Sequence, residues 1–224
     1  MPTNRRRFLE TAGAATVFRL AAEGPRLRAA SVQDHVRVGF IGSGIRGTQL
    51  IDDFKPIAGV SCVHVTDLYD GCLKRAQEQI GGQIQVGKDY RAVLDRKDVD
   101  AVVIAVPDHL HRRITLDALS AGKHVYIEKP MTWSLAEGPE IVAAEKASGK
   151  VLQVGSQAKT SSLTAKAREI VQSGRLGKVH MVRLANHRNN AQGAWKYEIP
   201  PDASPETIDW PRFLGHYKNK PFDA

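Results

Sequence analysis

The stretch Val36-Arg37-Val38-Gly39-Phe40-Ile41-Gly42-Ser43-Gly44-Ile45-Arg46-Gly47 decides the fold of this chain. Its first half, residues 36–41, is mostly apolar and predicts a buried strand. A glycine-rich turn follows at residues 42–47 and opens a predicted helix over residues 45–53. A strand, a Gly-x-Gly-x-x-Gly turn and a helix in this order are typical of a dinucleotide-binding unit.

The glycines of this turn each have a physical role in such a unit. Gly42 permits the tight turn, Gly44 lets backbone N–H groups approach a pyrophosphate, and Gly47 lets the helix pack closely on the sheet. Ile45 and Arg46 belong to the first turn of the helix, whose N-terminus carries a partial positive charge that favours phosphate. Residues 42, 44, 45, 46 and 47 are therefore candidate cofactor-binding residues.

Asp67 is the candidate ribose-binding residue. It lies 20 residues after Gly47, at the end of a second predicted strand over residues 60–66. A carboxylate at this point accepts hydrogen bonds from the adenosine ribose hydroxyls and repels a 2′-phosphate. The spacing therefore favours NAD over NADP, and an aspartate that only shapes the turn is the alternative.

Strands and helices alternate up to about residue 157. Strands are predicted over residues 36–41, 60–66, 101–106, 124–127 and 151–154. Helices are predicted over residues 45–53, 70–80, 90–94, 111–121 and 135–147. The run AVVIAV at 101–106 is apolar on both faces, as a strand covered by helices on both sides would be. This alternation predicts an α/β fold, a Rossmann-type doubly wound parallel sheet.

The composition excludes several classes of protein. The formal net charge is +8, but residues 1–30 hold six Arg against two Glu, so half of the excess lies in the tail. No concentrated basic stripe remains to bind nucleic acid. Two cysteines, Cys62 and Cys72, make no disulfide framework and no metal-ligand cluster. No segment has the length of uninterrupted apolar residues that a transmembrane helix needs.

The first 31 residues resemble an export signal. Asn4-Arg5-Arg6-Arg7-Phe8-Leu9-Glu10 is similar to a twin-arginine motif, and an apolar stretch follows over residues 11–18. This pathway suits a protein that folds around its cofactor before export. We expect a periplasmic or otherwise exported protein; a disordered basic tail on a cytoplasmic protein is the alternative.

Several stretches together resemble the Gfo/Idh/MocA oxidoreductase family, over roughly residues 35–217. They are Gly39-Phe40-Ile41-Gly42-Ser43-Gly44, Val106-Pro107-Asp108-His109-Leu110-His111, Ala121-Gly122-Lys123-His124-Val125-Tyr126-Ile127-Glu128-Lys129-Pro130 and Val154-Gly155-Ser156-Gln157. The resemblance implies oxidation of a sugar or polyol hydroxyl with a nicotinamide cofactor. It also implies a second domain built on an open antiparallel sheet, and a homo-oligomer in the full-length form.

Lys129 is the catalytic candidate that the resemblance implies. The matching lysine of the family stands near the nicotinamide and the reacting hydroxyl, where a cation stabilises developing negative charge. Partial burial would lower its pKa toward proton transfer. Glu128 would orient Lys129 or the cofactor, and an ordinary surface carboxylate is the alternative. A solvated loop lysine is the alternative for Lys129.

The resemblance implies further cofactor contacts at the ends of strands. Pro107, Asp108 and His111 follow the strand at 101–106, at the edge where dinucleotide folds bind their ligands. A strand terminator, a helix N-cap and a packed histidine are the respective alternatives. Gln157 is expected to reach the nicotinamide or substrate, with a simple loop amide as the alternative. His109 is expected to have only a packing role.

Residues 158–224 are expected to begin the second domain, after a Rossmann domain over 35–157. A helix is predicted over 162–173 and a strand over 179–186. Trp210 and Phe213 fall in a Pro-rich irregular segment and are expected to pack, with stacking on the face of a sugar ring as the alternative. The Asp and His that family members carry in the second domain have no match here. We therefore expect a truncated chain that binds NAD weakly and does not turn over.

Three functions remain open at this stage. The first is an NAD-dependent dehydrogenase of a sugar or polyol. The second is an NAD-dependent glycoside hydrolase of the same family, which oxidises and re-reduces the sugar so that no net NADH forms. The third is a non-catalytic NAD-binding protein.

Overall fold

A six-stranded parallel sheet organises the molecule. The computed structural model describes residues 35–82, 84–185, 191, 197–217 and 220–223. The strands are β1 (Val36–Ile41), β2 (Val60–Thr66), β3 (Gln85–Gly87), β4 (Ala101–Ile104), β5 (His124–Glu128) and β6 (Leu152–Gly155). Their order is β3-β2-β1-β4-β5-β6, and every pairing is parallel. Successive strands are added outward from β1 to one edge of the sheet and then outward from β4 to the other edge. This switch in strand order between β1 and β4 confirms the predicted doubly wound Rossmann fold.

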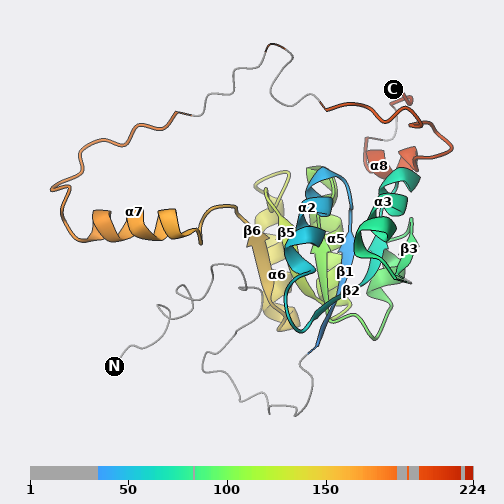
Figure 1. The fold of residues 1–224 in the computed structure, drawn as a ribbon, viewed down its shortest axis with the longest axis horizontal. Coiled ribbons are helices and arrows are strands. Elements are labelled where there is room, and N and C mark those ends of the chain that lie inside the picture. The colour runs from blue at the N-terminus through green and yellow to red at the C-terminus, as the bar shows by residue number, and fades with distance from the viewer. Residues whose placement is uncertain (1–34, 83, 186–190, 192–196, 218–219, 224) are drawn as a thin grey trace. The chain divides into compact units, whose positions relative to one another are not determined.

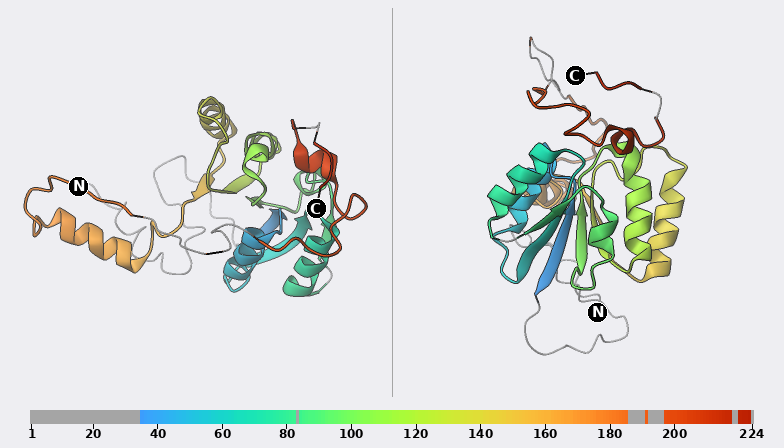
Figure 2. Two further views of the ribbon diagram at one scale, coloured as in Figure 1. Left: turned by 90° about the horizontal axis from the view of Figure 1, so that it is seen from above. Right: turned by 90° about the vertical axis from the view of Figure 1, so that its right-hand side faces the viewer.

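Helices connect the strands and cover both faces of the sheet. They are α2 (Ile45–Phe54), α3 (Asp70–Ile80), α4 (Arg91–Leu94), α5 (Asp108–Ser120) and α6 (Glu137–Ser148). Two more helices, α7 (Ser162–Gln172) and α8 (Trp210–Leu214), follow the last strand in the sequence. The helices α2 and α3 lie on one face of the sheet, and α5 and α6 lie on the other (Figures 1 and 2). Opposite faces are used because right-handed crossovers run in opposite directions from β1 and from β4.

Burial on both faces explains the composition of the central strands. Phe40 of β1 meets Phe54 of α2 edge-to-face, with ring centroids 5.8 Å apart. The next residue, Ile41, joins the buried cluster on the other face, together with Ile104 of β4 and Ile114 of α5. Successive side chains of a strand point to opposite faces, so a strand buried on both sides must be apolar throughout.

Most predicted elements are present, with shifts at their ends. The strands β1 and β2 and the helix α3 have the predicted bounds. The helix α5 begins at Asp108, three residues before the prediction, because Pro107 in extended conformation serves as its N-cap. The strand β4 ends at Ile104, two residues before the prediction. The three-residue strand β3 is too short to show a pattern and was missed.

The chain divides into two compact units, and one predicted strand in the smaller unit is absent. One unit contains Gln157–Pro200, and the other contains the sheet together with Pro201–Ala224. The helix α7 confirms the prediction for 162–173 and is exposed along its length. The strand predicted over 179–186 was wrong, since residues 179–185 have no regular structure. A short stretch with strand-like composition makes no strand without a neighbour to accept its hydrogen bonds. The export-like tail lies outside the described residues.

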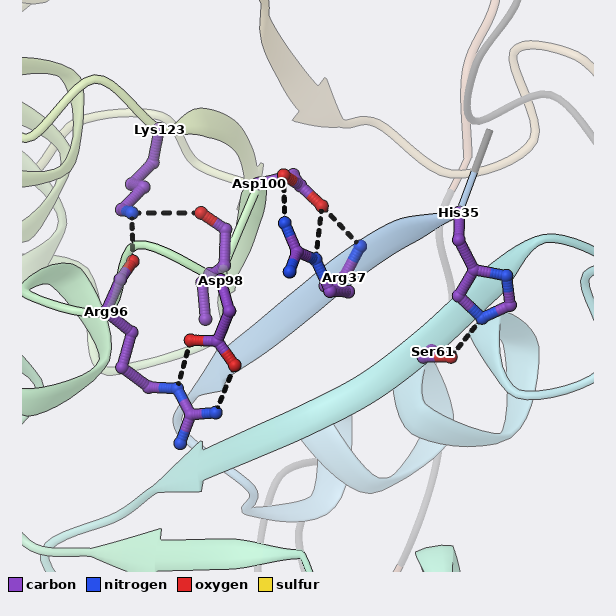
Figure 3. Close-up of polar contacts among 8 residues, drawn as sticks. His35, Arg37, Ser61, Arg96, Asp98, Asp100 and Lys123 are labelled. Carbon is purple, nitrogen blue, oxygen red and sulfur yellow. Dashed lines mark hydrogen bonds and ion pairs between the residues drawn. The ribbon is translucent and has the colours of Figure 1, made fainter. Parts of the chain in front are cut away.

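A buried lysine joins two connections at the amino-terminal edge of the sheet (Figure 3). Lys123 directly precedes β5, is only 7% exposed, and donates from Nζ to the carbonyls of Arg96 at 2.5 Å and Val99 at 2.9 Å. Burial lowers its pKa, against the opposing charges of Asp100 and Asp98. The ammonium group thus ties the turn before β5, to which Lys123 belongs, to the loop before β4, which lies 24 residues or more earlier in the sequence.

Replacing this lysine should destabilise the fold without touching the carboxyl-terminal edge. Lys123→Met keeps the apolar stem but leaves two buried carbonyls without their donor, so we expect the free energy of unfolding to fall by about 2 kcal/mol. Urea unfolding followed by circular dichroism measures it. The exposed Lys97 is the control, and its change to Met should stay within about 0.5 kcal/mol. Equal stabilities for the two variants would contradict the role of Lys123.

Candidate functional site: a nucleotide cavity at the carboxyl edge of the sheet

The glycine turn lies between β1 and α2, and two of its positions have room only for glycine. Gly42 has φ +90°, and a Cβ there would lie 2.4 Å from the carbonyl oxygen of Ala105. A Cβ on Gly47 would lie 2.2 Å from the carbonyl oxygen of Gly42. Both positions therefore require glycine for close backbone packing.

Gly44 differs from these two glycines. A Cβ on Gly44 would meet nothing within 4 Å, and Gly44 lines a cavity. As N-cap of α2 it offers no side-chain oxygen to the N–H groups of the first turn. Backbone N–H groups at a helix N-terminus bind phosphate, and a side chain here would fill the space that a phosphate needs. The turn therefore fits the pyrophosphate of a dinucleotide.

The cavity has a volume of about 730 Å³ and is mostly apolar. The strands and the connections that follow them contribute Ile41, Gly42, Gly44, Thr66, Asp67, Leu68, Tyr69, Cys72, Lys88, Asp89, Tyr90, Arg91, Ala105, Val106, Pro107, Leu110, Arg113 and Ile114. The C-terminal segment contributes Ile208, Pro211, Arg212, Phe213 and Gly215. A cleft of this size at the topological switch point is where doubly wound folds bind their ligands.

Asp67 is held at the wall of this cavity by the glycine turn itself. Its Oδ2 accepts the N–H of Ser43 at 2.7 Å, and its Oδ1 accepts the N–H of Tyr69 at 3.0 Å. Burial raises the pKa of Asp67, although the hydrogen bonds from Ser43 and Tyr69 oppose this. A carboxylate has about four acceptor positions, so capacity remains on Oδ1 for a ribose hydroxyl.

Glu128 is buried, and its partner comes from the glycine turn. Its Oε1 accepts from Arg46 Nε at 2.8 Å, and its Oε2 accepts the backbone N–H of Lys129 at 3.1 Å. Only 6% of the Glu128 side chain is exposed. Burial acts to lower the pKa of Arg46, but the hydrogen bond and charge of Glu128 outweigh it and raise the pKa. The pair fixes the start of α2 against the end of β5.

Gly155 of β6 leaves the room for this ion pair. A Cβ on Gly155 would lie 2.5 Å from Tyr126 Oη and 2.9 Å from Glu128 Oε1. The two residues stand on β5, and Glu128 is the register partner of Gly155. The neighbouring strand therefore has no side chain at the point where Glu128 turns toward Arg46.

Lys129 lies directly after β5, and its side chain is exposed. It is not among the residues that line the cavity. The bond between Lys129 and Pro130 is cis. The exposed ammonium group does not meet the partial burial that we considered from the sequence. Its placement at the carboxyl edge, next to the Arg46–Glu128 pair, keeps it available to a ligand.

The other predicted contacts divide into two groups. Pro107 lines the cavity and caps α5, whereas Asp108 belongs to the first turn of α5 and is not the N-cap. His111 is buried, with Nδ1 2.6 Å from the Pro130 carbonyl and Nε2 2.9 Å from the Val106 carbonyl. It joins the connection that follows β4 to the connection that follows β5, and it does not line the cavity.

Two further predicted residues are not brought to the cavity. Ile45 begins α2 and is 52% exposed. Gln157 belongs to the other compact unit, so its contact with a cofactor stays a prediction. The cofactor roles of Ile45, Asp108, His111 and Gln157 therefore rest on the sequence.

One side of the cavity was not predicted from the sequence. Phe213 and its neighbours on α8 line it, although we expected an irregular packing segment there. A local signal was present, because Asp209 followed by Pro211 is a typical helix start, and Asp209 does accept the N–H of Arg212 at 3.2 Å. The position at which this short helix docks has no signal in the local sequence.

Neither cysteine offers a reactive thiol. Burial raises the pKa of Cys62 and of Cys72 to about 11, so both stay protonated near neutral pH.

Over the described ranges, no group of three or more His, Cys, Asp or Glu side chains is arranged to hold a metal ion. None of the helices in the described part has the length and apolar character needed to cross a bilayer.

Comparisons with known proteins agree with this geometry. A sequence model of the GFO_IDH_MocA oxidoreductase family, with an NAD-binding Rossmann fold, matches residues 36–156. The chain is similar to a glycosyl hydrolase family 109 protein of Shewanella baltica, at 32% identity in an alignment of 165 residues. The match covers 62% of this chain and 36% of that protein.

Two solved structures share the fold. A myo-inositol 2-dehydrogenase from Lactobacillus plantarum has a TM-score of 0.61 and 26% identity, over 65% of this chain and 43% of that one. A 3-ketoreductase from Actinomadura kijaniata, in complex with TDP-benzene and NADP, has a TM-score of 0.58 and 27% identity, over 62% of this chain and 43% of that one. The chain spans less than half the length of each of these three relatives.

Proposed function

Because this chain belongs to the Gfo/Idh/MocA oxidoreductase family, we propose that it binds NAD and serves the transfer of a hydride from a sugar or polyol hydroxyl. The observation that carries the cofactor is the open space over Gly44 in a cavity that also reaches Asp67. The first accommodates the pyrophosphate and the second accepts the ribose hydroxyls.

The residues after β5 would act on the substrate. A bound nicotinamide would supply the hydride acceptor. Lys129 would donate a hydrogen bond to the reacting oxygen and stabilise the charge that develops there. Glu128 accepts the backbone N–H of Lys129, so the Arg46–Glu128 pair would orient the lysine relative to the phosphate-binding turn. Lys129 is thus the proposed catalytic residue and Glu128 a positioning residue.

Asp67 should determine the choice between NAD and NADP. The variant Asp67→Asn loses the negative charge. We expect its affinity for NAD to fall about tenfold, which corresponds to the energy of one to two hydrogen bonds. NADP should then bind almost as well as NAD. Calorimetric titration of both nucleotides measures the ratio. Asp52→Asn on the exposed side of α2 is the control and should leave both affinities unchanged. Unaltered nucleotide preference in Asp67→Asn would contradict the ribose role.

The same carboxyl predicts a pH dependence of binding. Because burial raises the pKa of Asp67, the carboxyl takes up its proton at a pH above the ordinary range of aspartate. The protonated group loses acceptor capacity, so NAD affinity should weaken as the pH falls through that window. Titrations of NAD at a series of pH values, from neutral downward for as long as the chain stays folded, should show this for the unaltered chain and not for Asp67→Asn.

The similarity to a glycosyl hydrolase family 109 protein favours a second function. In that function the enzyme oxidises the sugar transiently, releases the aglycone and reduces the product again. Incubation with NAD and either free sugars and polyols or aryl glycosides separates the possibilities. NADH formed from a free sugar supports the dehydrogenase, and aglycone release without net NADH supports the glycosidase. Cofactor binding with neither product supports a non-catalytic NAD-binding protein.

Export remains a proposal that rests on the tail sequence Asn4-Arg5-Arg6-Arg7-Phe8-Leu9. A reporter fused to residues 1–31 should leave the cytoplasm, and it should stay there once Arg5 and Arg6 are both changed to Lys. Export of both fusions, or of neither, would rule out the twin-arginine route.

A further inference from the structure

The segment at residues 202–217, here called the docked segment, lies at the carboxyl edge of the sheet (Figures 1 and 2). Its residues Ile208, Pro211, Arg212, Phe213 and Gly215 form one wall of the cavity. It lies outside residues 36–156, which the family model matches. Its backbone pairs with the connection that follows β2. The N–H of Asp209 donates to the Leu68 carbonyl at 2.9 Å, and the N–H of Asp70 donates to the Thr207 carbonyl at 3.1 Å.

Side chains from two other connections hold the docked segment as well. Lys88, after β3, donates from Nζ to the Thr207 carbonyl at 3.2 Å. His109, at the start of α5, places Nε2 2.8 Å from the Phe213 carbonyl, which requires the tautomer that donates from Nε2. The docked segment is therefore attached to the connections after β2, β3 and β4, which are the three that surround the Asp67 side of the cavity.

Its own sequence shapes the segment for this position. Asp209 caps α8, and Gly215 ends it with φ +58°, a conformation that favours glycine. A Cβ on Gly215 would lie 3.1 Å from Leu110 Cδ2. The chain thus comes down closely on α5 just after Phe213.

The charges around this wall are paired, which bears on the kind of ligand it fits. Lys88 pairs with Asp70 at 3.0 Å, and Arg212 lies 3.4 Å from Asp209 and 3.7 Å from Asp89. Compensated cations and apolar side chains such as Leu110 and Phe213 favour an uncharged ring over a phosphate. The phosphate position is at the N-terminus of α2.

We infer that the docked segment is the outer wall of the adenosine half of the cofactor site, and that Phe213 contributes directly to its affinity for the adenine ring. This inference rests on the proposed function, because Asp67 identifies this side as the adenosine side. An aromatic ring buries a large apolar area against a base, and such contacts contribute strongly to binding.

The test compares two phenylalanines that both contact Trp210. The ring of Phe213 stacks on Trp210 and lines the cavity, whereas Phe222 meets Trp210 edge-to-face and does not line it. In the full chain, Phe213→Ala should weaken AMP, ADP-ribose and NAD by about tenfold each, one base-stacking contact, and leave nicotinamide mononucleotide unchanged. Phe222→Ala should leave all four affinities unchanged. Calorimetric titration supplies the values.

A second measurement does not depend on any variant. In hydrogen exchange of the unaltered chain, AMP and NAD should both slow the amides of residues 207–215, and nicotinamide mononucleotide should not. Equal AMP affinity in Phe213→Ala and the unaltered chain overturns the inference, and so does a lack of protection of residues 207–215 by AMP. In either case, NAD binding by the unaltered chain would still support the proposed function. An unaltered chain that binds neither AMP nor NAD overturns both.

Discussion

The Gly44→Ala variant will fold as stably as the unaltered chain and will bind NAD about a hundredfold more weakly. Gly44 has φ −63°, which any residue adopts, and its Cβ would meet nothing within 4 Å. The added methyl group therefore meets no steric obstacle in the protein, and only the weaker N-cap preference of alanine counts against it. In the complex it would occupy the space of the pyrophosphate and break hydrogen bonds to a charged group worth about 1.5–3 kcal/mol each, and 1.4 kcal/mol is tenfold in affinity.

Gly47→Ala provides the contrast, since there the cost falls on the fold. Alanine gains about 1 kcal/mol over glycine inside a helix. Its Cβ, however, would lie 2.2 Å from the Gly42 carbonyl oxygen, and Gly42 has no freedom to move away because it lies against Ala105. We expect the clash to win, with a net loss of about 2 kcal/mol in the free energy of unfolding.

Urea unfolding and NAD titration of both variants separate these effects. Gly44→Ala should change the titration alone, and Gly47→Ala should change both. NAD binding by Gly44→Ala with the affinity of the unaltered chain would remove the main support for the phosphate position. A stability loss in Gly44→Ala equal to that in Gly47→Ala would mean that the turn is closed where the structure shows it open.

The second large effect concerns the Arg46–Glu128 ion pair. Arg46→Ala should lower the free energy of unfolding by about 3 kcal/mol, because it leaves a buried carboxylate that, within the described part of the chain, keeps the backbone N–H of Lys129 as its donor. Glu128→Ala should cost less, since the Arg46 side chain is 31% exposed and keeps access to water. The double variant should be more stable than Arg46→Ala, because it no longer buries a lone charge.

A double-mutant cycle by urea unfolding measures the coupling between the two residues. Arg112 and Glu140 form the matched control, an Arg–Glu pair between α5 and α6 with side chains 40% and 51% exposed. Arg112→Ala should cost at most about 1 kcal/mol, as for other solvated pairs. A cost for Arg46→Ala as small as that for Arg112→Ala would mean that Glu128 is solvated in solution.

The local part of the fold could be predicted because its causes are local. The strand at 36–41, the glycine turn and α2 follow from apolar pattern and backbone sterics within a dozen residues. The strict alternation that follows implies a parallel sheet, and the parallel sheet places Asp67 and Pro107 at one edge because all strands end there. Those two residues do line the cavity.

The predictions from sequence failed where a structural feature depends on residues that lie far away in the sequence. The apolar run at 179–185 has the composition of a strand but no regular structure, because a strand exists only through its neighbour. Phe213 was expected to pack, and it lines the cavity because α8 docks on connections more than 100 residues earlier. A five-residue helix carries no signal for its docking position.

The sequence by itself determined the Rossmann unit, the glycine turn and the carboxylate beside it, because steric limits on glycine and the period of apolar residues act between neighbours. Only the tertiary structure decided that Glu128 is buried against Arg46, 82 residues before it, and that residues 202–217 close the cavity. Burial and pairing of charges depend on what surrounds a side chain in space, and that surrounding is assembled from segments that the sequence keeps apart.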